Sequence, residues 1–139
     1  MALQNVIDYI TIQSTGNAID FGDLLANTQR LTGTSDETRG IIGGGLAPSA
    51  NNVIQYITMA STGNSIDFGD LIGSNNHNFT ATSNSISGVF AGGRTAGGTG
   101  QNIIQYITIQ SLGNATDFGD LTAGRYNVGG LSNGTGGMN

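Results

Sequence analysis

The stretch Asn5–Leu24, with the sequence NVIDYITIQSTGNAIDFGDL, sets the organisation of this chain. It returns with few changes as residues 52–71 and again as residues 102–121, so that Tyr9, Tyr56 and Tyr106 mark one position at offsets of 47 and 50 residues. Self-similarity with a period of this length indicates one supersecondary unit repeated along the chain. A unit of this size buries too little apolar surface alone, so we expect the repeats to pack on one another in a single domain covering residues 1–139.

The composition favours a β protein that is rich in turns. Ile, Val and Thr stand in short alternating runs, and 24 glycines separate these runs. Alternation with a period of two residues is typical of strands, whereas no segment keeps the apolar period of a helix. We therefore predict an all-β fold of three tandem four-stranded antiparallel repeats, with repeat cores at residues 5–45, 52–93 and 102–139.

Individual strands can be predicted within each repeat. Both faces of the first strand, Val6–Ile12, are largely apolar, which predicts a strand that is covered on both sides. A second, short strand, Ala18–Phe21, follows a turn at Gly16 and Asn17. The remaining predicted strands are Gln29–Ser35, Arg39–Gly45, Asn78–Ala81, Ser87–Gly93, Asn127–Leu131 and Thr135–Asn139.

Charge and cysteine content exclude several classes of function. The formal net charge is −5, and the four basic residues are all arginines. Binding to nucleic acid or to an anionic membrane surface requires a basic face, so neither partner is predicted. No cysteine is present, which excludes disulfides and thiolate chemistry. We also find no signal peptide and no apolar run of membrane-spanning length, and we expect synthesis in the cytoplasm without membrane insertion.

The motif Asp-Phe-Gly-Asp occurs in every repeat. Its first aspartate is Asp20, Asp67 or Asp117, and its phenylalanine is Phe21, Phe68 or Phe118. Paired carboxylates and turn carbonyls are oxygen ligands of the kind that Ca²⁺ prefers. The alternative is a structural turn in which aspartate bonds backbone amides and phenylalanine fills the core. Because the motif repeats at equivalent places, we favour the structural role and predict no cofactor.

The residues that differ between the repeats are the candidates for contacts with a ligand or partner, since loops on a rigid scaffold commonly carry binding. An arginine and an aromatic ring near Asn-rich loops would suit a glycan. His77 has no second histidine or cysteine with which to build a metal site or a catalytic triad, so no enzymatic activity is predicted. These candidate residues are Arg30, His77, Asn78, Arg94, Arg125 and Tyr126.

The order of features within a repeat resembles the blade of a kelch-type β-propeller. The features are an apolar strand ending in a double glycine (Gly43–Gly44 and Gly92–Gly93), a strand with the repeated tyrosine, and a short strand with an aromatic residue before leucine. The amino-acid sequence of the repeat, Tyr-Ile-Thr-Ile…Gly-Asn…Asp-Phe-Gly-Asp-Leu, is also similar to degenerate kelch-like repeats in structural proteins of marine bacteriophages.

This resemblance implies that the chain begins at the third strand of a blade and ends at the second strand of another. Two complete blades and two complementary parts would then need association, either as a six-bladed ring of two chains or as a fibre. The implied function is that of a non-enzymatic virion component, such as a tail-fibre, appendage or capsid-decoration protein, with itself and other virion proteins as partners. The alternatives are a closed threefold β-trefoil or β-prism and a lectin-like module that binds host-surface carbohydrate.

Overall fold

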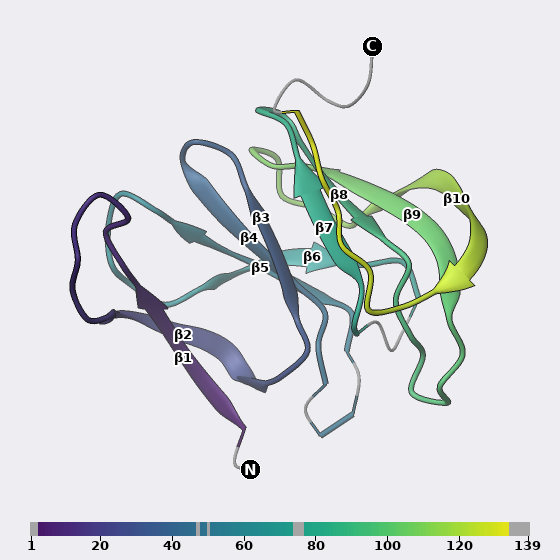
Figure 1. Ribbon diagram of the computed structural model, residues 1–139, viewed down its shortest axis with the longest axis horizontal. Helices are drawn as coiled ribbons and strands as arrows, with labels where there is room; N and C mark the ends of the chain where they lie inside the picture. Colours follow the sequence, from purple (N-terminus) through teal and green to yellow (C-terminus); the bar gives the residue numbers. More distant parts are fainter. Residues whose placement is uncertain (1–2, 47, 50, 74–76, 134–139) are drawn as a thin grey trace.

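The computed structural model describes residues 3–46, 48–49, 51–73 and 77–133, and within these residues the chain is all-β, without a helix. Its strands form three antiparallel sheets of two, four and four strands (Figure 1), which confirms the prediction of an all-β antiparallel protein. No helix of the described part is long and apolar enough to cross a membrane. The strands are β1 (Gln4–Tyr9), β2 (Ile19–Thr28), β3 (Thr32–Ser35), β4 (Arg39–Gly43), β5 (Val53–Thr58), β6 (Ile66–Asp70), β7 (Thr80–Ser83), β8 (Ser87–Ala91), β9 (Gln101–Thr108) and β10 (Thr116–Arg125).

Each sheet is a meander, in which strands that follow one another in sequence are hydrogen-bonded neighbours. The first sheet is β1–β2, the second runs from β3 to β6, and the third runs from β7 to β10. The turns that join β3 to β4 and β7 to β8 are held by side chains. The Asp36 carboxylate accepts hydrogen bonds from the backbone N–H groups of Thr38 and Arg39, and the Asn84 side-chain oxygen accepts the equivalent pair from Ile86 and Ser87.

The sheets do not coincide with the sequence repeats. The most similar part of each repeat forms β1–β2, β5–β6 or β9–β10, which are the last two strands of a sheet. The strands between these parts, β3–β4 and β7–β8, are the first two strands of the next sheet. The described part of the chain thus holds a two-stranded sheet followed by two four-stranded sheets, whereas the partial sheet that the kelch resemblance implies after β10 is not seen as strands among residues 127–133.

Several predicted strand bounds differ from those observed. The first strand ends at Tyr9 rather than Ile12, and the predicted short strand Ala18–Phe21 is the start of the ten-residue β2. Residues 127–131 are not a strand, and the predicted strand 135–139 lies outside the described residues. The double glycines that correspond in the structure are Gly44–Gly45 and Gly92–Gly93, all with positive φ, so the pairing of Gly43–Gly44 with Gly92–Gly93 was shifted by one residue.

The Asp-Phe-Gly-Asp motif is a β-bulge inside a strand rather than a turn between strands. In β6, Asp67 pairs with Gln55 and Gly69 pairs with Ile54, so Phe68 is the extra residue between two consecutive partners. Phe21 and Phe118 occupy the same bulged position in β2 and β10. A bulge bends its strand and re-aims a side chain. The bulge explains why glycine follows each of these phenylalanines.

The hydrophobic core lies between the two four-stranded sheets. Ile41, Ile54 and Phe68 of the second sheet pack with Phe90 and Ile107 of the third. In β5, consecutive residues Ile54 and Gln55 are both buried, as expected for a strand covered on two faces. The same prediction is wrong for β1, where Val6 is exposed, because in the described part of the chain the β1–β2 sheet has a neighbouring sheet on one face only.

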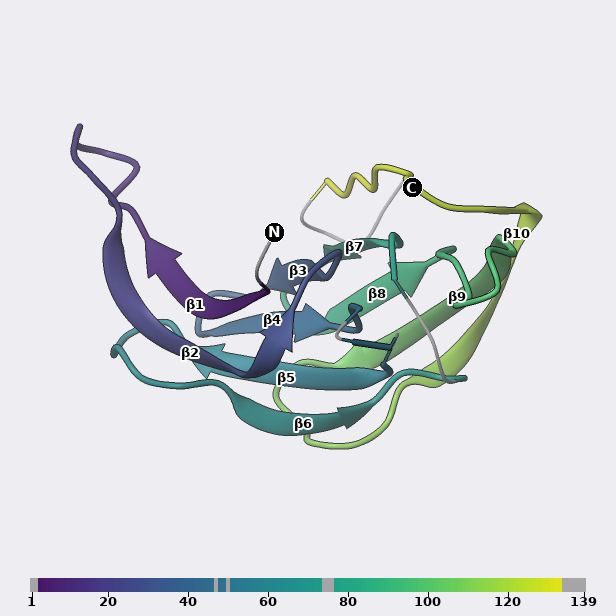
Figure 2. The same cartoon turned by 90° about the horizontal axis from the view of Figure 1, so that it is seen from below.

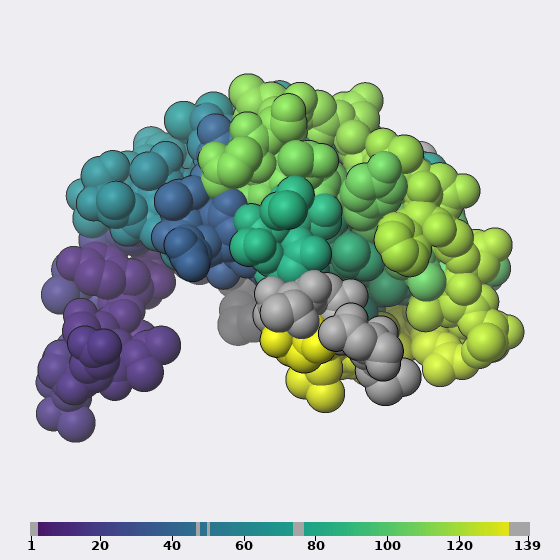
Figure 3. Space-filling model, turned by 90° about the horizontal axis from the view of Figure 1, so that it is seen from above, coloured from purple at the N-terminus to yellow at the C-terminus, as the bar shows by residue number. Residues whose placement is uncertain are grey.

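The three sheets follow one another along an open arc. In Figure 3 the N-terminal residues stand at one end of the arc and the residues of β10 lie at the other. The loop between β1 and β2, residues 10–18, projects away from the other sheets (Figure 2). None of the sheets in the described part of the chain is closed. This open arrangement differs from the closed barrel that a β-trefoil would require.

Candidate functional site

Two of the predicted contact residues occupy one repeated position, shortly before the first strand of a four-stranded sheet. Arg30 and Asn78 precede β3 and β7, and Asn127 holds the third equivalent place; all three have positive φ. The Asn78 N–H donates to the Arg30 carbonyl at 3.2 Å, and the Asn127 N–H donates to the Asn78 carbonyl at 2.8 Å. The Asn78 amide also donates to the Asn127 side-chain oxygen at 2.6 Å. These bonds therefore join the segment before the third sheet to the segment before the second, and residue 127 to the segment before the third.

His77 and Arg94 are brought together as neighbours. Their backbones exchange two hydrogen bonds, His77 N–H to the Arg94 carbonyl and Arg94 N–H to the His77 carbonyl. The His77 ring is buried, and its Nδ1 has no partner among the described atoms. Burial lowers the pKa of His77, and the positive charges of Arg30 and Arg94 lower it further. The imidazole is therefore neutral at physiological pH.

Tyr126 joins this group, whereas Arg125 does not. The Arg94 guanidinium lies over the Tyr126 ring, 5.1 Å from its centroid, which is the geometry of a cation–π contact. The Arg125 side chain is exposed and bonds within β10, to the Ala123 carbonyl at 3.3 Å and to the Thr122 hydroxyl at 3.3 Å. The structure thus gathers Arg30, His77, Asn78, Arg94 and Tyr126 through backbone hydrogen bonds, one cation–π contact and the charges that Arg30 and Arg94 place near His77.

The repeated aspartates do not gather into a metal site. Within the described residues, no group of three or more acidic, histidine or cysteine side chains could hold a metal ion. Asp20, Asp67 and Asp117 lie on separate sheets, in β2, β6 and β10. The Asp117 carboxylate accepts a hydrogen bond from the Gly119 N–H at 3.1 Å, across the bulge. This is a structural use of the carboxylate at that position.

The repeated tyrosines and phenylalanines form one aromatic pair in each sheet. Tyr56 and Phe68 meet edge to face, with centroids 6.2 Å apart and an interplanar angle of 81°. The pairs Tyr9–Phe21 and Tyr106–Phe118 have nearly the same geometry. Such T-shaped pairs add about 0.5–1.5 kcal/mol beyond their buried area. In the second sheet the Arg39 guanidinium also lies over the Tyr56 ring, 4.5 Å from its centroid.

A repeated set of hydrogen bonds, which we call the joint, connects the last strand of each sheet to the loop before the last strand of the next. From β2, the carbonyls of Phe21 and Asp23 accept the N–H groups of Gly63 and Ser65, each at 2.8 Å. The Asp23 N–H donates to the Asn64 side-chain oxygen at 3.0 Å. Finally, the Leu25 N–H donates to the buried Gln55 side-chain oxygen at 2.9 Å.

The second joint repeats the first, from β6 to the third sheet. The carbonyls of Phe68 and Asp70 accept the N–H groups of Gly113 and Ala115 at 2.9 and 2.8 Å. The Asp70 N–H donates to the Asn114 side-chain oxygen at 3.0 Å, and the Ile72 N–H donates to that of Gln105 at 2.6 Å. The two glutamines and two asparagines of the joints were not predicted from the sequence. The sequence did contain a signal for the two glutamines, because each is a polar residue at the same repeat position inside an otherwise apolar strand.

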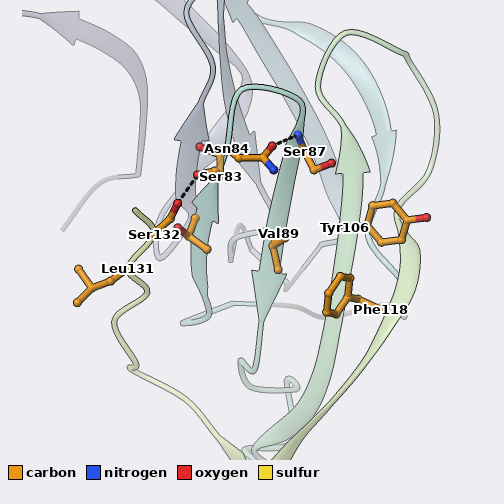
Figure 4. Close-up of a pocket in the computed structure, with 9 residues that line it drawn as sticks. Ser83, Asn84, Ser87, Val89, Tyr106, Phe118, Leu131 and Ser132 are labelled. Carbon is orange, nitrogen blue, oxygen red and sulfur yellow. Dashed lines mark hydrogen bonds between the residues drawn. The ribbon is translucent and has the colours of Figure 1, made fainter. Parts of the chain in front are cut away.

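The outer face of the third sheet carries a groove of about 270 Å³. Figure 4 shows Val89, Tyr106 and Phe118 on one side of it, and Leu131 and Ser132 on the other. The Ser132 hydroxyl donates to the Ser83 carbonyl at 2.7 Å, as the Ser83 hydroxyl donates to the Ser35 carbonyl at 2.6 Å. Residues 127–133 therefore lie along β7 much as β7 lies along β3.

Comparisons with known proteins leave the function to be argued from this geometry. No protein-family model matches the chain, and no curated protein sequence matches it.

Proposed function

We propose that this protein is a non-enzymatic structural subunit that works by associating with itself through its β-sheets. The sheets are proposed to be kelch-like propeller blades that are completed by oligomerisation. Two four-stranded meanders in succession and their arrangement along an open arc (Figure 3) support this proposal. Homo-oligomers that close head to tail into rings, or remain open as fibres, are the assemblies such subunits make.

One observation carries the proposal: the two ends of the array are complementary. At one end, β1–β2 form a sheet of two strands where the others have four. At the other end, residues 127–133 repeat the backbone bond of Asn78 and the side-chain bond of Ser83 in β7, which both reach the preceding repeat. A segment placed as the start of a further sheet could add strands to the two-stranded β1–β2 sheet of a second copy. Strand addition at an exposed sheet edge is a common mode of association.

The virion role rests on the resemblance of the repeat to structural proteins of marine bacteriophages. A virion protein of this kind would serve in a tail fibre, an appendage or the decoration of a capsid, beside other virion proteins. The chemistry of the described residues is compatible with this role, because its polar clusters join sheets to one another. The repeated aspartates belong to the bulged motif of each sheet, and one aromatic pair packs in each sheet.

The test is the solution mass of the purified chain, measured by multi-angle light scattering over a range of concentrations. A particle of twice the chain mass of 14.2 kDa supports a shared six-sheet ring, and a larger polydisperse particle supports a fibre. A monomer at every concentration contradicts the assembly role.

A carbohydrate-binding role is the second candidate, because Arg125 and Tyr126 are exposed neighbours at the end of β10. A glycan array with the wild-type chain and with Tyr126→Ala tests it. Binding that is lost in the variant would support a lectin, and no binding to any glycan would dismiss it.

A further inference from the structure

We propose that the outer face of the third sheet is a docking surface for the N-terminal sheet of a second copy of this chain. The two copies meet head to tail, with the loop 10–18 and β1–β2 of one copy placed on β10 of the other. The contact reproduces the joint that the chain makes twice internally. This inference deepens the proposed self-association and rests on it, since it names the surfaces and the register.

The bulged phenylalanines differ sharply in exposure. Phe21 and Phe68 are 8% and 3% exposed, and each lies on a sheet that a four-stranded sheet follows. Phe118 is 66% exposed, although it pairs with Tyr106 as the other two pair with their tyrosines. Phe118 also differs from both in that no sheet follows it in the described part of the chain. The Phe118 ring therefore forms an exposed apolar surface, which we take as one side of the proposed contact.

An apolar residue on the other side of the joint shows the opposite trend. Ile12, Met59 and Ile109 hold the same place in the three loops, and their exposed fractions are 92%, 41% and 0%. In the described part of the chain, no sheet precedes the sheet of Ile12, a two-stranded sheet precedes that of Met59, and a four-stranded sheet precedes that of Ile109. Exposure of this residue falls as the preceding sheet becomes more complete. The exposed Ile12 side chain is thus the other side of the proposed apolar contact.

The backbone of β10 is free to make the same bonds, because β10 is an edge strand of its sheet. The internal joints assign each bond by equivalence. The carbonyls of Phe118 and Asp120 would accept the N–H groups of Gly16 and Ala18 from the second copy. The Asp120 N–H would donate to the side-chain oxygen of Asn17. Asp8, which stands in the place of Gln55 and Gln105, would accept the Thr122 N–H with its carboxylate.

The space needed for this approach is open at β10 and filled at the other two strands. A Cβ placed on Gly22 or Gly69 would lie 2.4 Å from the carbonyl oxygen of Gly63 or Gly113, the glycine of the next sheet's loop. A Cβ on Gly119 would meet nothing within 4 Å. Glycine at this position allows a second backbone to approach closely. At Gly119 the approaching backbone would be that of Gly16.

The groove beside Phe118 fits the apolar side chains that would enter it. On the second sheet, the equivalent surface around Ile41 and Tyr56 is covered by the buried cluster that includes Ile107 and Ile109. Next to that cluster, the Gln110 amide donates to the Asp36 carboxylate at 2.5 Å and to the Thr38 hydroxyl at 2.7 Å. In the intermolecular joint, Ile10 and Ile12 would enter the groove near Val89, and Gln13 would bond Asn84 at the matching turn.

The occupant is a second copy because one chain carries both halves. A surface that pairs with a different patch of the same molecule makes a heterologous contact, which closes into a ring or continues as a fibre. The geometry therefore predicts that damage to either half blocks association, and that two differently damaged chains can still join through their undamaged halves.

The experiment uses Ile12→Asp and Phe118→Asp in the full chain, with Ile66→Asp as the matched control. Ile66 is an exposed isoleucine on β6 that lies outside the proposed contact. We expect each of the first two variants to elute at the mass of one chain and the control to keep the wild-type mass. Mixing Ile12→Asp with Phe118→Asp should restore a one-to-one pair through the single intact joint.

The outcomes separate this inference from the function on which it rests. A wild-type chain that stays monomeric overturns both. A wild-type oligomer whose mass is unchanged by Ile12→Asp and by Phe118→Asp leaves self-association standing and overturns this joint. Two monomeric variants that fail to pair on mixing also overturn it, because a head-to-tail contact requires that complementation.

Discussion

The side-chain oxygen of Gln55 accepts a hydrogen bond from the backbone N–H of Leu25 at 2.9 Å and thereby links the second sheet to the first. The same oxygen accepts the Ser65 hydroxyl at 2.6 Å, and Gln55 is buried. One polar atom thus satisfies two donors inside the joint. A buried donor that loses its partner costs about 1–3 kcal/mol.

Replacement of Gln55 by methionine keeps the length of the side chain and removes both bonds. We expect Gln55→Met to lower the free energy of unfolding by about 1–2 kcal/mol, because the partly buried Leu25 N–H loses its acceptor and the Ser65 hydroxyl loses one of its two acceptors. Urea unfolding followed by far-UV circular dichroism measures the change. Ser65→Ala is the control, because alanine stands at the equivalent positions 18 and 115. A Gln55→Met loss no larger than that of the control would mean that water replaces the glutamine.

Phe68 and Phe118 allow the same substitution to be compared in buried and exposed surroundings. Phe68→Ala should cost about 3–5 kcal/mol, since it removes a buried ring from the core. Phe118→Ala should cost less than about 1 kcal/mol in a single chain, where that ring is exposed. Both are to be measured in the Ile12→Asp background, so that association does not contribute to stability. Equal losses for the two variants would contradict the placement of the third sheet at the end of the array.

The buried His77 predicts a dependence of stability on pH. Burial and two nearby arginines lower the folded-state pKa below the ordinary value of 6.5. The unfolded chain then binds more protons than the folded chain, so the stabilising effect of a neutral ring is fully present above pH 6.5 and is lost as the pH falls below it. The midpoint of urea unfolding should decrease over that interval. His77→Gln, which copies Gln29 at the equivalent position, should remove this part of the decrease.

Asp36 predicts a second, more acidic transition. Burial alone would raise its pKa, but hydrogen bonds from the Arg39 backbone, the Gln110 side chain, and the Thr38 backbone and hydroxyl hold the pKa at about 2. Because the folded-state pKa is lowered from 3.8, the contribution of the carboxylate is present above pH 3.8 and is lost as the pH falls towards 2. Asp36→Asn, which copies Asn84 in the matching turn, should show a smaller loss of stability over this interval. Identical acid transitions in the two proteins would exclude this role for Asp36.

The internal repeat and its strand-forming pattern were sufficient to predict an all-β antiparallel protein. Tyr56 and Phe68 were also recognised as repeated structural positions, since both residues return in each repeat, but their contact was seen only in the structure. These features are local: an alternation of two residues, a glycine at a bulge and an asparagine at a turn act within a few positions of the chain.

Tertiary structure decided which copy of a repeated residue is buried. Phe68 and Phe118 have the same neighbours in sequence, yet only Phe68 is covered, because a complete sheet follows it. The roles of Gln55 and Gln105 were hidden for the same reason, since their hydrogen-bond partners are 30 and 33 residues away. Burial depends on the surface of the next sheet, and that surface exists only after distant strands have paired. The local sequence therefore determines the strands and turns of each repeat. The packing of one sheet on the next determines which copy of a repeated side chain is buried and which is exposed.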